Sequence, residues 1–319
     1  MWSKYPEIEN ELVLVEELIR KSISSRNKLL SQIVNELVQA GGKRLRPAFV
    51  LISAKIGKYD RKKALAMAGA LEILHTATLV HDDIIDRSQL RRGRVTVSEK
   101  YGADMAVYTG DFLFTRAIQM LSKDISIDKL EVVAGSIKTI CEGEVDQYQG
   151  RFNIDTSVVA YLKRIQRKTA ILFGAASAVG AQIGECPKSI AIKLGRFGLF
   201  YGMAFQIRDD INDFMSSEGS SGKPVEKDLR EGVITLPIIY AIQNNAQLRT
   251  IVEESLQKGT SITTKDVMEI CRLVREYKGV EEARKLQEKY IQKGLKELNA
   301  LEDSAYKKIF TELITELRG

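Results

Sequence analysis

One motif, Asp-Asp-x-x-Asp, occurs twice in this chain, and each copy ends a long apolar segment. The first copy covers residues 82–86 and follows "ALEILHTATLVH", and the second covers residues 209–213 and follows "FGLFYGMAFQIR". Neither segment contains a proline or the apolar–polar alternation that is typical of a strand, so each predicts a buried helix that ends at its motif. The fold must therefore bury two helices and accommodate a group of carboxylates at the end of each.

The spacing within each motif brings its carboxylates together. Helix positions i and i+4 share a face, with i+3 beside them, and carboxylates about 5–6 Å apart repel by roughly 2–3 kcal/mol per pair at an effective dielectric of about 20. No lysine or arginine lies within either motif. Oxygen ligands that leave room for water suit Mg²⁺, which is usually held by one or two carboxylates plus substrate phosphates. A single motif could be an exposed polar helix end, but two copies with identical spacing favour a metal site.

Few prolines and few period-two segments predict an almost all-α protein. Only 5 of the 319 residues are proline, and 44% are hydrophobic, which suffices for a large core. This length permits two average domains or one large domain. Because the two motifs need a common centre and no linker is evident, we expect a single domain over residues 1–319, a helical bundle with a central cavity.

Helical periodicity predicts two helices in residues 7–40, then helices at 61–87, 104–122, 128–148, 157–182 and 188–214, and further amphipathic helices from 233 to 318. Gly41-Gly42 ends the second helix, and Pro47 fits the first turn of the next. The basic residues 43–46 thus lie at a helix N-terminus, which is either an anion site or a solvated turn. The segment "MSSEGSSGKPVEKDLREG" predicts a loop that acts as a mobile lid.

The distribution of charge indicates the class of ligand, and the cysteine spacing indicates the cellular compartment. The net charge is +6, and basic residues cluster at 43–46, 91–94 and 163–168 without interleaved aromatic residues, so a polyphosphate or an anionic lipid is favoured over nucleic acid. The three widely spaced cysteines show no CxxC pattern, which favours a reducing cytoplasm. We expect no secretory leader, because acids punctuate the N-terminal segment, and no membrane span, because no stretch of about 18 apolar residues is evident.

The motifs in sequence order resemble those of the trans-isoprenyl diphosphate synthases, and among them the long-chain polyprenyl diphosphate synthases. The matching segments cover nearly the whole chain: "GGKRLRP", "LVHDDIIDRSQLRRG", "RKTA", "GMAFQIRDDINDF", "GKPVEKDL" and "TLPIIYA". The chain is similar to the large catalytic subunit of the hexaprenyl and heptaprenyl diphosphate synthases of Gram-positive bacteria. This implies the all-α isoprenoid synthase fold and a prenyltransferase that adds isopentenyl diphosphate to farnesyl or geranylgeranyl diphosphate after Mg²⁺-assisted ionisation.

The resemblance also implies roles for single residues. About three Mg²⁺ ions would be held by Asp82, Asp83, Asp86, Asp209, Asp210 and Asp213. The allylic diphosphate would be gripped by Arg91, Lys168 and Lys223, while Thr169 and Gln206 would face the carbocation. Isopentenyl diphosphate would be bound by Lys43, Arg46, His75 and Arg92. Catalysis would rest on the motif aspartates with Lys168, Thr169 and Gln206, and Glu144 and Gln147 match a motif near the metals.

Three positions need comment. A lone histidine on an apolar helix is more often a core residue, but the position of His75, seven residues before Asp82, favours binding. Val233 stands where relatives often carry a lysine that touches the allylic diphosphate, so the remaining cations must suffice or turnover is reduced. Asn212 replaces a commonly apolar residue, and nothing in the sequence explains it.

Product length is predicted from the helix that leads to the first motif. Leu74, Ala77 and Thr78 lie one and two turns before Asp82, and the resemblance implies that short-chain relatives carry an aromatic ring near positions 77–78. Small side chains here would let the growing chain pass, and each unit buries apolar carbons at about 0.8 kcal/mol per CH₂. We expect a product of roughly six to eight isoprene units, about C30–C40, for a quinone side chain. The alternative product is that of a medium-chain geranylgeranyl or farnesylgeranyl diphosphate synthase. The alternative role of Ala77 and Thr78 is that they merely pack against a neighbouring helix.

Other classes fit less well. Terpene cyclases and squalene or phytoene synthases carry differently spaced acids, and a di-iron bundle needs Glu-x-x-His ligands. A non-catalytic regulatory subunit usually loses one Asp motif, whereas this chain keeps both. The partners implied are the two diphosphate substrates, a second copy of the chain or a small second subunit, and a membrane touched peripherally for product release. We expect a cytoplasmic enzyme with no nucleic-acid partner.

Overall fold

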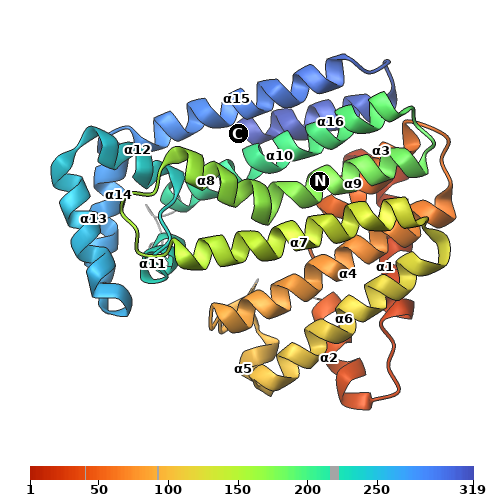
Figure 1. Cartoon of the computed structure of the whole chain (residues 1–319), viewed down its shortest axis with the longest axis horizontal. Coiled ribbons are helices and arrows are strands. Elements are labelled where there is room, and N and C mark those ends of the chain that lie inside the picture. Colours follow the sequence, from red (N-terminus) through yellow and green to blue (C-terminus); the bar gives the residue numbers. More distant parts are fainter. Residues whose placement is uncertain (40, 92, 216–222) are drawn as a thin grey trace. The chain divides into compact units, whose positions relative to one another are not determined.

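The structure is a computed structural model that describes residues 1–39, 41–91, 93–215 and 223–319, without the side chains of residues 123, 124, 223, 224 and 260. It is almost entirely helical, so the predicted all-α class is confirmed (Figure 1). The α-helices are α1 (Pro6–Ser22), α2 (Lys28–Gln39), α3 (Leu45–Lys55), α4 (Arg61–Ile85), α5 (Val97–Tyr101), α6 (Ala103–Asp124), α7 (Ile127–Gln149), α8 (Val158–Ile165), α9 (Ile171–Ile183), α10 (Lys188–Met215), α11 (Lys223–Arg230), α12 (Leu236–Asn244), α13 (Ala246–Lys258), α14 (Thr264–Glu276), α15 (Gly279–Asn299) and α16 (Ala305–Thr315). Short 3₁₀ turns are η1 (Trp2–Lys4), η4 (Gly259–Ser261) and η5 (Glu316–Arg318).

Contacts between residues divide the chain into two compact units. Unit 1 comprises residues 1–134, 175–195 and 303–309, and unit 2 comprises residues 135–174, 196–302 and 310–319. The helices α7, α9, α10 and α16 each contribute residues to both units. That the whole chain forms a single domain stays a prediction.

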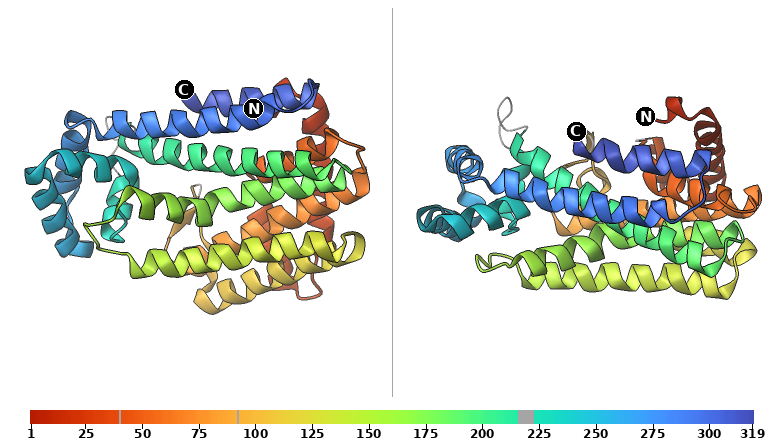
Figure 2. Two further views of the ribbon diagram at one scale, coloured as in Figure 1. Left: turned by 45° about the horizontal axis from the view of Figure 1, so that its top comes forward. Right: turned by 90° about the horizontal axis from the view of Figure 1, so that it is seen from above.

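The helix α4 is the centre of unit 1, and α1, α3 and α6 pack against it (Figures 1 and 2). It begins after Asp60, whose side chain accepts a hydrogen bond from the backbone N–H of Lys63 (3.2 Å). By length and composition α4 could cross a membrane, which corrects our expectation that no such stretch exists. However, 67% of its most apolar window is buried, as is typical of a helix in the middle of a bundle.

A short antiparallel hairpin follows α4 where the sequence predicts only a loop. Its strands β1 (Leu90–Arg91) and β2 (Arg94–Val95) pair directly, and Gly93 adopts a positive φ of 76° between them. The hydroxyl of Thr96 donates to the carbonyl of Ser88 (2.7 Å) and caps α5, a helix that the sequence does not predict. The hairpin is thereby closed at its base, which places Arg91 next to the end of α4.

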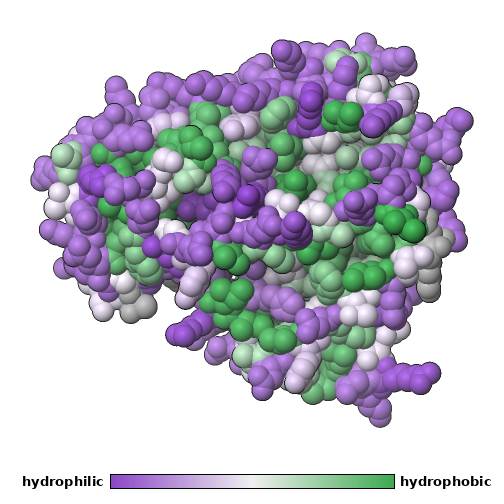
Figure 3. Space-filling view, viewed as in Figure 1, coloured by the Kyte–Doolittle hydropathy of each residue, from purple (hydrophilic) through white to green (hydrophobic). Residues whose placement is uncertain are grey.

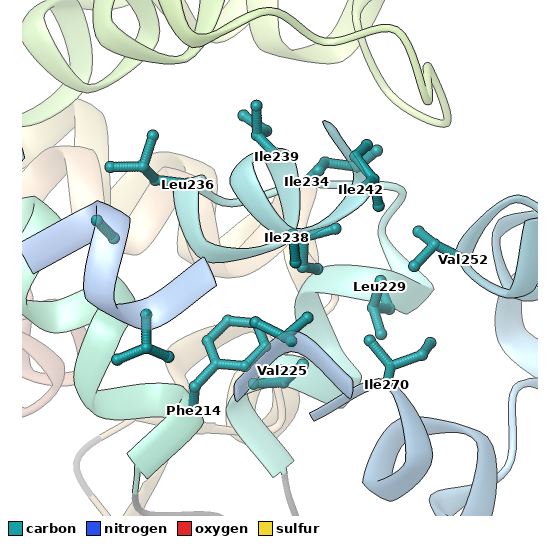
Figure 4. Packing of buried hydrophobic residues seen from close by; sticks show 14 of the residues in the cluster. Phe214, Val225, Leu229, Ile234, Leu236, Ile238, Ile239, Ile242, Val252 and Ile270 are labelled. Carbon is teal, nitrogen blue, oxygen red and sulfur yellow. The ribbon is translucent and has the colours of Figure 1, made fainter. Parts of the chain in front are cut away.

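A large apolar cluster forms the core of unit 2 (Figure 4). Helices α11 to α14 contribute to it together with Phe214, near the end of α10. Residues 223–230, predicted as loop, are helical because Val225 and Leu229, four positions apart, both face this core. Residues 216–222, where the rest of the predicted lid falls, lie outside the described residues, so the lid stays a prediction.

The segment predicted as a helix at 157–182 is helical but not regular. Between α8 and α9 lies η2, a π-helical turn at Gln166–Ala170, in which the N–H of Ile171 donates to the carbonyl of Gln166. Such turns are rare and occur frequently at functional sites. This one contains the "RKTA" segment singled out in the sequence.

Candidate functional site

Both Asp motifs lie at the C-terminal ends of helices. Asp82 and Asp83 are in the last turn of α4, Asp86 directly follows it, and residues 209–213 are in the last two turns of α10. The C-terminal end of a helix carries a partial negative charge, so a carboxylate there costs about 0.3–1 kcal/mol at an exposed site. Two such ends that both carry aspartates are unfavourable unless cations bind them.

Within the first motif, Asp83 is held by Arg91. The Nε of Arg91 donates to Oδ1 of Asp83 at 2.7 Å, and Asp83 is only 5% exposed. Because β1 carries Arg91, the hairpin brings a predicted diphosphate ligand directly against the predicted metal site. Its neighbour Arg92 lies outside the described residues.

Two of the residues predicted for isopentenyl diphosphate also come together in unit 1. The Nη1 of Arg46, in the first turn of α3, lies 3.0 Å from Nε2 of His75 on α4. A guanidinium can only donate, so Nε2 of His75 accepts and the ring orients the cation. Lys43 is exposed just before α3. The third basic residue of this turn, Arg44, instead pairs with buried Glu72 (2.6 Å), so it is not part of an anion site.

A cavity of about 490 Å³ lies between α2, α4, the hairpin and α5. Its wall includes His75, Asp83 and Arg91 together with aliphatic residues such as Leu79. Successive helix residues advance by about 100°, which places Leu79 nearly opposite Ala77 on α4. Among the described residues that line this cavity, none of the chain-length candidates Leu74, Ala77 and Thr78 occurs, so it is not the predicted product tunnel.

Within the second motif, Asp210 is held by two side chains of unit 2. The hydroxyl of Tyr161 donates to Oδ2 of Asp210 at 2.6 Å, and Nε2 of Gln206 donates to Oδ1 at 2.9 Å. The hydroxyl of Thr169 in turn donates to Oε1 of Gln206 at 2.8 Å. The predicted residues Thr169 and Gln206 are therefore joined to the second Asp motif by a continuous chain of hydrogen bonds.

Several carboxylates of unit 2 influence one another around Asp210. Burial, followed by the charges of Asp210 and Asp209, raises the pKa of Asp213 to about 7. Burial and the charges of Asp210 and Asp213 likewise raise the pKa of Asp228, on α11, well above its usual range. Arg164 acts in the opposite direction on the pKa values of Asp210 and Asp228. Among the described residues these carboxylates disfavour one another's charged forms, which suits the binding of cations.

The π-turn η2 presents Lys168 and Thr169. The Nζ of Lys168 lies 3.0 Å from a carboxylate oxygen of Glu144 on α7, and Arg167 pairs with Asp146 of the same helix at 2.6 Å. Glu144 matched a family motif in the sequence, and here it holds the predicted diphosphate ligand Lys168. The π-turn η2 therefore contacts α7 through Arg167 and Lys168, and it contacts α10 through the hydrogen bond from Thr169 to Gln206.

Glycines make room for this wide turn. A Cβ atom at Gly202 of α10 would lie 2.5 Å from the Cα of Ala170, and one at Gly143 of α7 would lie 2.7 Å from the Cβ of Arg167. These distances are shorter than real Cβ contacts, so only glycine permits the approach.

The donor atoms suit Mg²⁺. Each motif offers carboxylate oxygens only, which are the ligands that this hard cation prefers. No three His, Cys, Asp or Glu side chains form a ready cluster in the part of the chain that the structure describes. The aspartates of each motif therefore do not form the three-carboxylate group that the helical spacing predicts, and a cation here would be held by one or two carboxylates and completed by substrate oxygens.

Other predicted residues are not gathered here. Gln147 lines a separate cavity of about 320 Å³ at the end of α7. The side chain of Lys223 lies outside the described residues. The N–H of Val233, which follows α11, donates to the carbonyl of Asp228. Sequence reasoning missed Tyr161 and Asp228. Neither lies within an Asp motif. Asp228 does belong to the matching segment "GKPVEKDL", but only the fold reveals that both residues lie near Asp210.

Comparison with known proteins places this geometry in context. The sequence model of the polyprenyl synthetase family matches residues 27–274. Heptaprenyl diphosphate synthase component 2 of Geobacillus stearothermophilus is 36% identical over 93% of this chain and 92% of its own length. Octaprenyl diphosphate synthase of Haemophilus influenzae is 32% identical over 94% of this chain and 91% of its own length.

Solved structures of polyprenyl diphosphate synthases are also similar to this chain. Heptaprenyl diphosphate synthase from Staphylococcus aureus matches with a TM-score of 0.91 and 36% identity over 98% of both chains. A polyprenyl synthase from Caulobacter crescentus, complexed with calcium and isoprenyl diphosphate, matches with a TM-score of 0.90 and 31% identity over 97% of this chain and 94% of its own.

Proposed function

The chain belongs to the polyprenyl synthetase family, and we propose that it is a long-chain trans-polyprenyl diphosphate synthase. It is a prenyltransferase. In the proposed reaction the C–O bond of an allylic diphosphate breaks, and the alkene of isopentenyl diphosphate forms a C–C bond to the resulting carbocation. Loss of a proton then restores an allylic diphosphate that is one unit longer.

The observation that carries this proposal is the pairing of each Asp motif with groups suited to an ionising diphosphate. In unit 1, Arg91 donates a hydrogen bond to Asp83. In unit 2, hydrogen bonds connect Thr169 to Gln206 and Gln206 to Asp210, and Thr169 directly follows Lys168 in the sequence. Mg²⁺, when bound by the motif carboxylates, would neutralise the growing charge of the leaving diphosphate. Fixed donors aimed at a developing charge supply much of the rate of such reactions.

The protein's own residues then have separate tasks. Arg91 and Lys168 bind diphosphate oxygens, and each is oriented by a carboxylate, Asp83 and Glu144 respectively. Arg46, oriented by His75, binds the diphosphate of the second substrate. Thr169 and Gln206 present fixed dipoles to the carbocation. These dipoles take the place of water, which would react with the carbocation.

The direct test is an incubation of the purified chain with farnesyl diphosphate, labelled isopentenyl diphosphate and Mg²⁺, with products separated by length. We expect a ladder that ends near six to eight isoprene units and disappears when the metal is chelated. Asp82→Asn should lower the rate by at least about 100-fold, whereas Asp104→Asn, an exposed acid at the start of α6, serves as the matched control. Product formation by Asp82→Asn at the control's rate would contradict the proposal.

A second candidate is a catalytic subunit that needs a small partner. It is favoured by the name "component 2" of the Geobacillus relative. No ladder from the chain alone, but a ladder after the small subunit of a two-subunit synthase is added, would establish this candidate. The length of that ladder also separates a long-chain product from a medium-chain one.

Self-association is the other arrangement we propose. Apolar side chains are exposed on α6 at Val107 (41%), Tyr108 (64%) and Ile118 (42%), and hydrophobic patches lie among hydrophilic ones on the face shown in Figure 3. A homodimer that covers α6 would bury them. Light scattering of the purified chain measures this directly, and Tyr108→Lys should shift a dimer toward the monomer.

A further inference from the structure

We propose that Tyr161 is a positioning residue, which holds the carboxylate of Asp210 in the orientation that binds a divalent cation. This inference rests on the proposed function, because it takes the second Asp motif as a cation site. Tyr161 lies on α8, outside both motifs.

The contact between the two side chains is short and buried. The phenolic oxygen lies 2.6 Å from Oδ2 of Asp210, Tyr161 is 0% exposed, and Asp210 is 7% exposed. Gln206 occupies the other oxygen at 2.9 Å. With one donor on each oxygen the plane of the carboxylate is fixed, and each oxygen keeps a second lone pair that can meet a cation.

Tyr161 is itself held in place. The guanidinium of Arg164 lies 5.3 Å from the centre of its ring, and Nη2 of Arg164 donates to the carbonyl of Ile234 at 2.7 Å. The hydroxyl of Ser157 caps the start of α8 by accepting from the N–H of Ala160. The ring therefore cannot swing away, and the hydroxyl is aimed at a fixed point.

Carboxylates around Asp210 explain why this anchor matters. Asp209 and Asp213 belong to the same motif and lie with Asp210 in the last two turns of α10. Without the hydroxyl, the Oδ2 atom would lose its donor and the carboxylate could rotate away from its neighbours. Hydrogen-bond partners of metal ligands typically change metal affinity by about 10- to 100-fold when they are removed.

The experiment measures cation binding rather than turnover. Isothermal titration of the full-length chain with Mg²⁺, in the presence of inorganic diphosphate, should give an affinity about 10-fold weaker for Tyr161→Phe than for the unaltered chain. Tyr290→Phe is the matched control, because it removes a hydroxyl from a half-buried ring of unit 2 that packs on Phe200. Thermal unfolding of each variant reports whether the fold is kept.

The outcomes are distinct. Unchanged Mg²⁺ affinity in a folded Tyr161→Phe variant overturns the inference and leaves the proposed function standing, whereas no Mg²⁺ binding by the unaltered chain overturns the proposed function itself. A second measurement compares Asp210→Asn with and without Tyr161→Phe, because Asp210→Asn removes the carboxylate that the phenol would position. If Tyr161 acts through Asp210, its replacement adds no further loss in that background, and a further loss of about 10-fold overturns the inference.

Discussion

At the residue scale, the second aspartate of each Asp motif has side-chain partners elsewhere in the chain. The second aspartate of each is held by the protein, Asp83 by Arg91 and Asp210 by Tyr161 and Gln206. The sequence predicts equal roles for all three, because spacing along a helix defines a shared face but not a partner. Tyr161 lies 49 residues from Asp210, and no local pattern connects them.

Arg91→Lys should raise the KM for the allylic diphosphate by about 10-fold. The Nε of Arg91 donates to Asp83, and a planar guanidinium keeps other N–H groups in a rigid fork that one ammonium cannot reproduce. Steady-state kinetics with varied farnesyl diphosphate measures the effect. Arg94→Lys on the paired strand is the matched control, and equal KM values for both variants would argue against this role.

Glu72→Gln should lower the free energy of unfolding by roughly 1–3 kcal/mol. The side chains of Arg44 and Glu72 are only 9% and 8% exposed, so the change removes a buried charged hydrogen bond and leaves the guanidinium with Glu16, which is 33% exposed, as its charged partner. Urea unfolding measures the loss. Glu282→Gln breaks an exposed pair with Lys285 and should cost less than about 1 kcal/mol, and similar losses in the two variants would contradict this account.

At the element scale, helices are well predicted where apolar periodicity is long. The helix predicted at 61–87 is α4, and that predicted at 188–214 is α10. The errors are short elements: α5 and the hairpin are too brief to show a period, and α11 depends on burying Val225 and Leu229 in a core formed by distant helices. The π-turn was not predicted, because its extra residue leaves no mark in the hydrophobic pattern.

The start of α14 should show a defined pH dependence. Hydrogen bonds from the backbone and hydroxyl of Thr263, together with Lys258, lower the pKa of Asp266 to about 2. Since this is below the ordinary value of 3.8, the ionised carboxylate stabilises the fold above that value, and its contribution disappears as the pH falls toward about 2. Asp266→Asn should therefore destabilise the protein at pH values near 7 and progressively less below about 4.

Thr263→Ala tests the same capping box without removing a charge, and loss of this cap should cost about 1 kcal/mol. Urea unfolding across the pH range gives both values. An Asp266→Asn effect that does not change between neutral and acid pH would contradict the role of the ionised carboxylate.

Gly202→Ala should destabilise unit 2 and disturb the π-turn, because the new methyl group would lie 2.5 Å from the Cα of Ala170. A loss of about 1–3 kcal/mol is expected for such overpacking, together with weaker binding of diphosphate. Gly135→Ala is the matched control: nothing lies within 4 Å of the added Cβ in α7, so a gain of about 0.5–1 kcal/mol is expected. Thermal unfolding separates a loss from a gain.

At the scale of the whole molecule, the sequence predicts the all-α class and the family, because motifs spread over most of the chain each carry part of the signal. It does not reveal the division of contacts into two units, since four helices continue from one unit to the other without a linker. Product length also depends on the whole path of the growing chain, and relatives of similar identity are named for heptaprenyl and octaprenyl products.

Ala77→Tyr should shorten the product to about three or four isoprene units if the chain grows past this face of α4. Ala77 is 1% exposed, so a ring there must occupy neighbouring space. Leu79→Tyr on the opposite side, where the 490 Å³ cavity offers room, should leave the length unchanged. Separation of dephosphorylated products by length measures both, and an unaltered distribution for Ala77→Tyr would refute this path.

The π-turn has a consequence for how such an enzyme can change by insertion or deletion. Its ring closes from Gln166 to Ile171, one residue wider than an α-helical turn, so α8 is rotated by about one residue step of 100° relative to a continuous helix. Deleting a single residue from this turn would restore a regular helix and turn Tyr161 away from Asp210. One codon would therefore separate the present contact between Tyr161 and Asp210 from a chain that keeps both Asp motifs but loses this alignment.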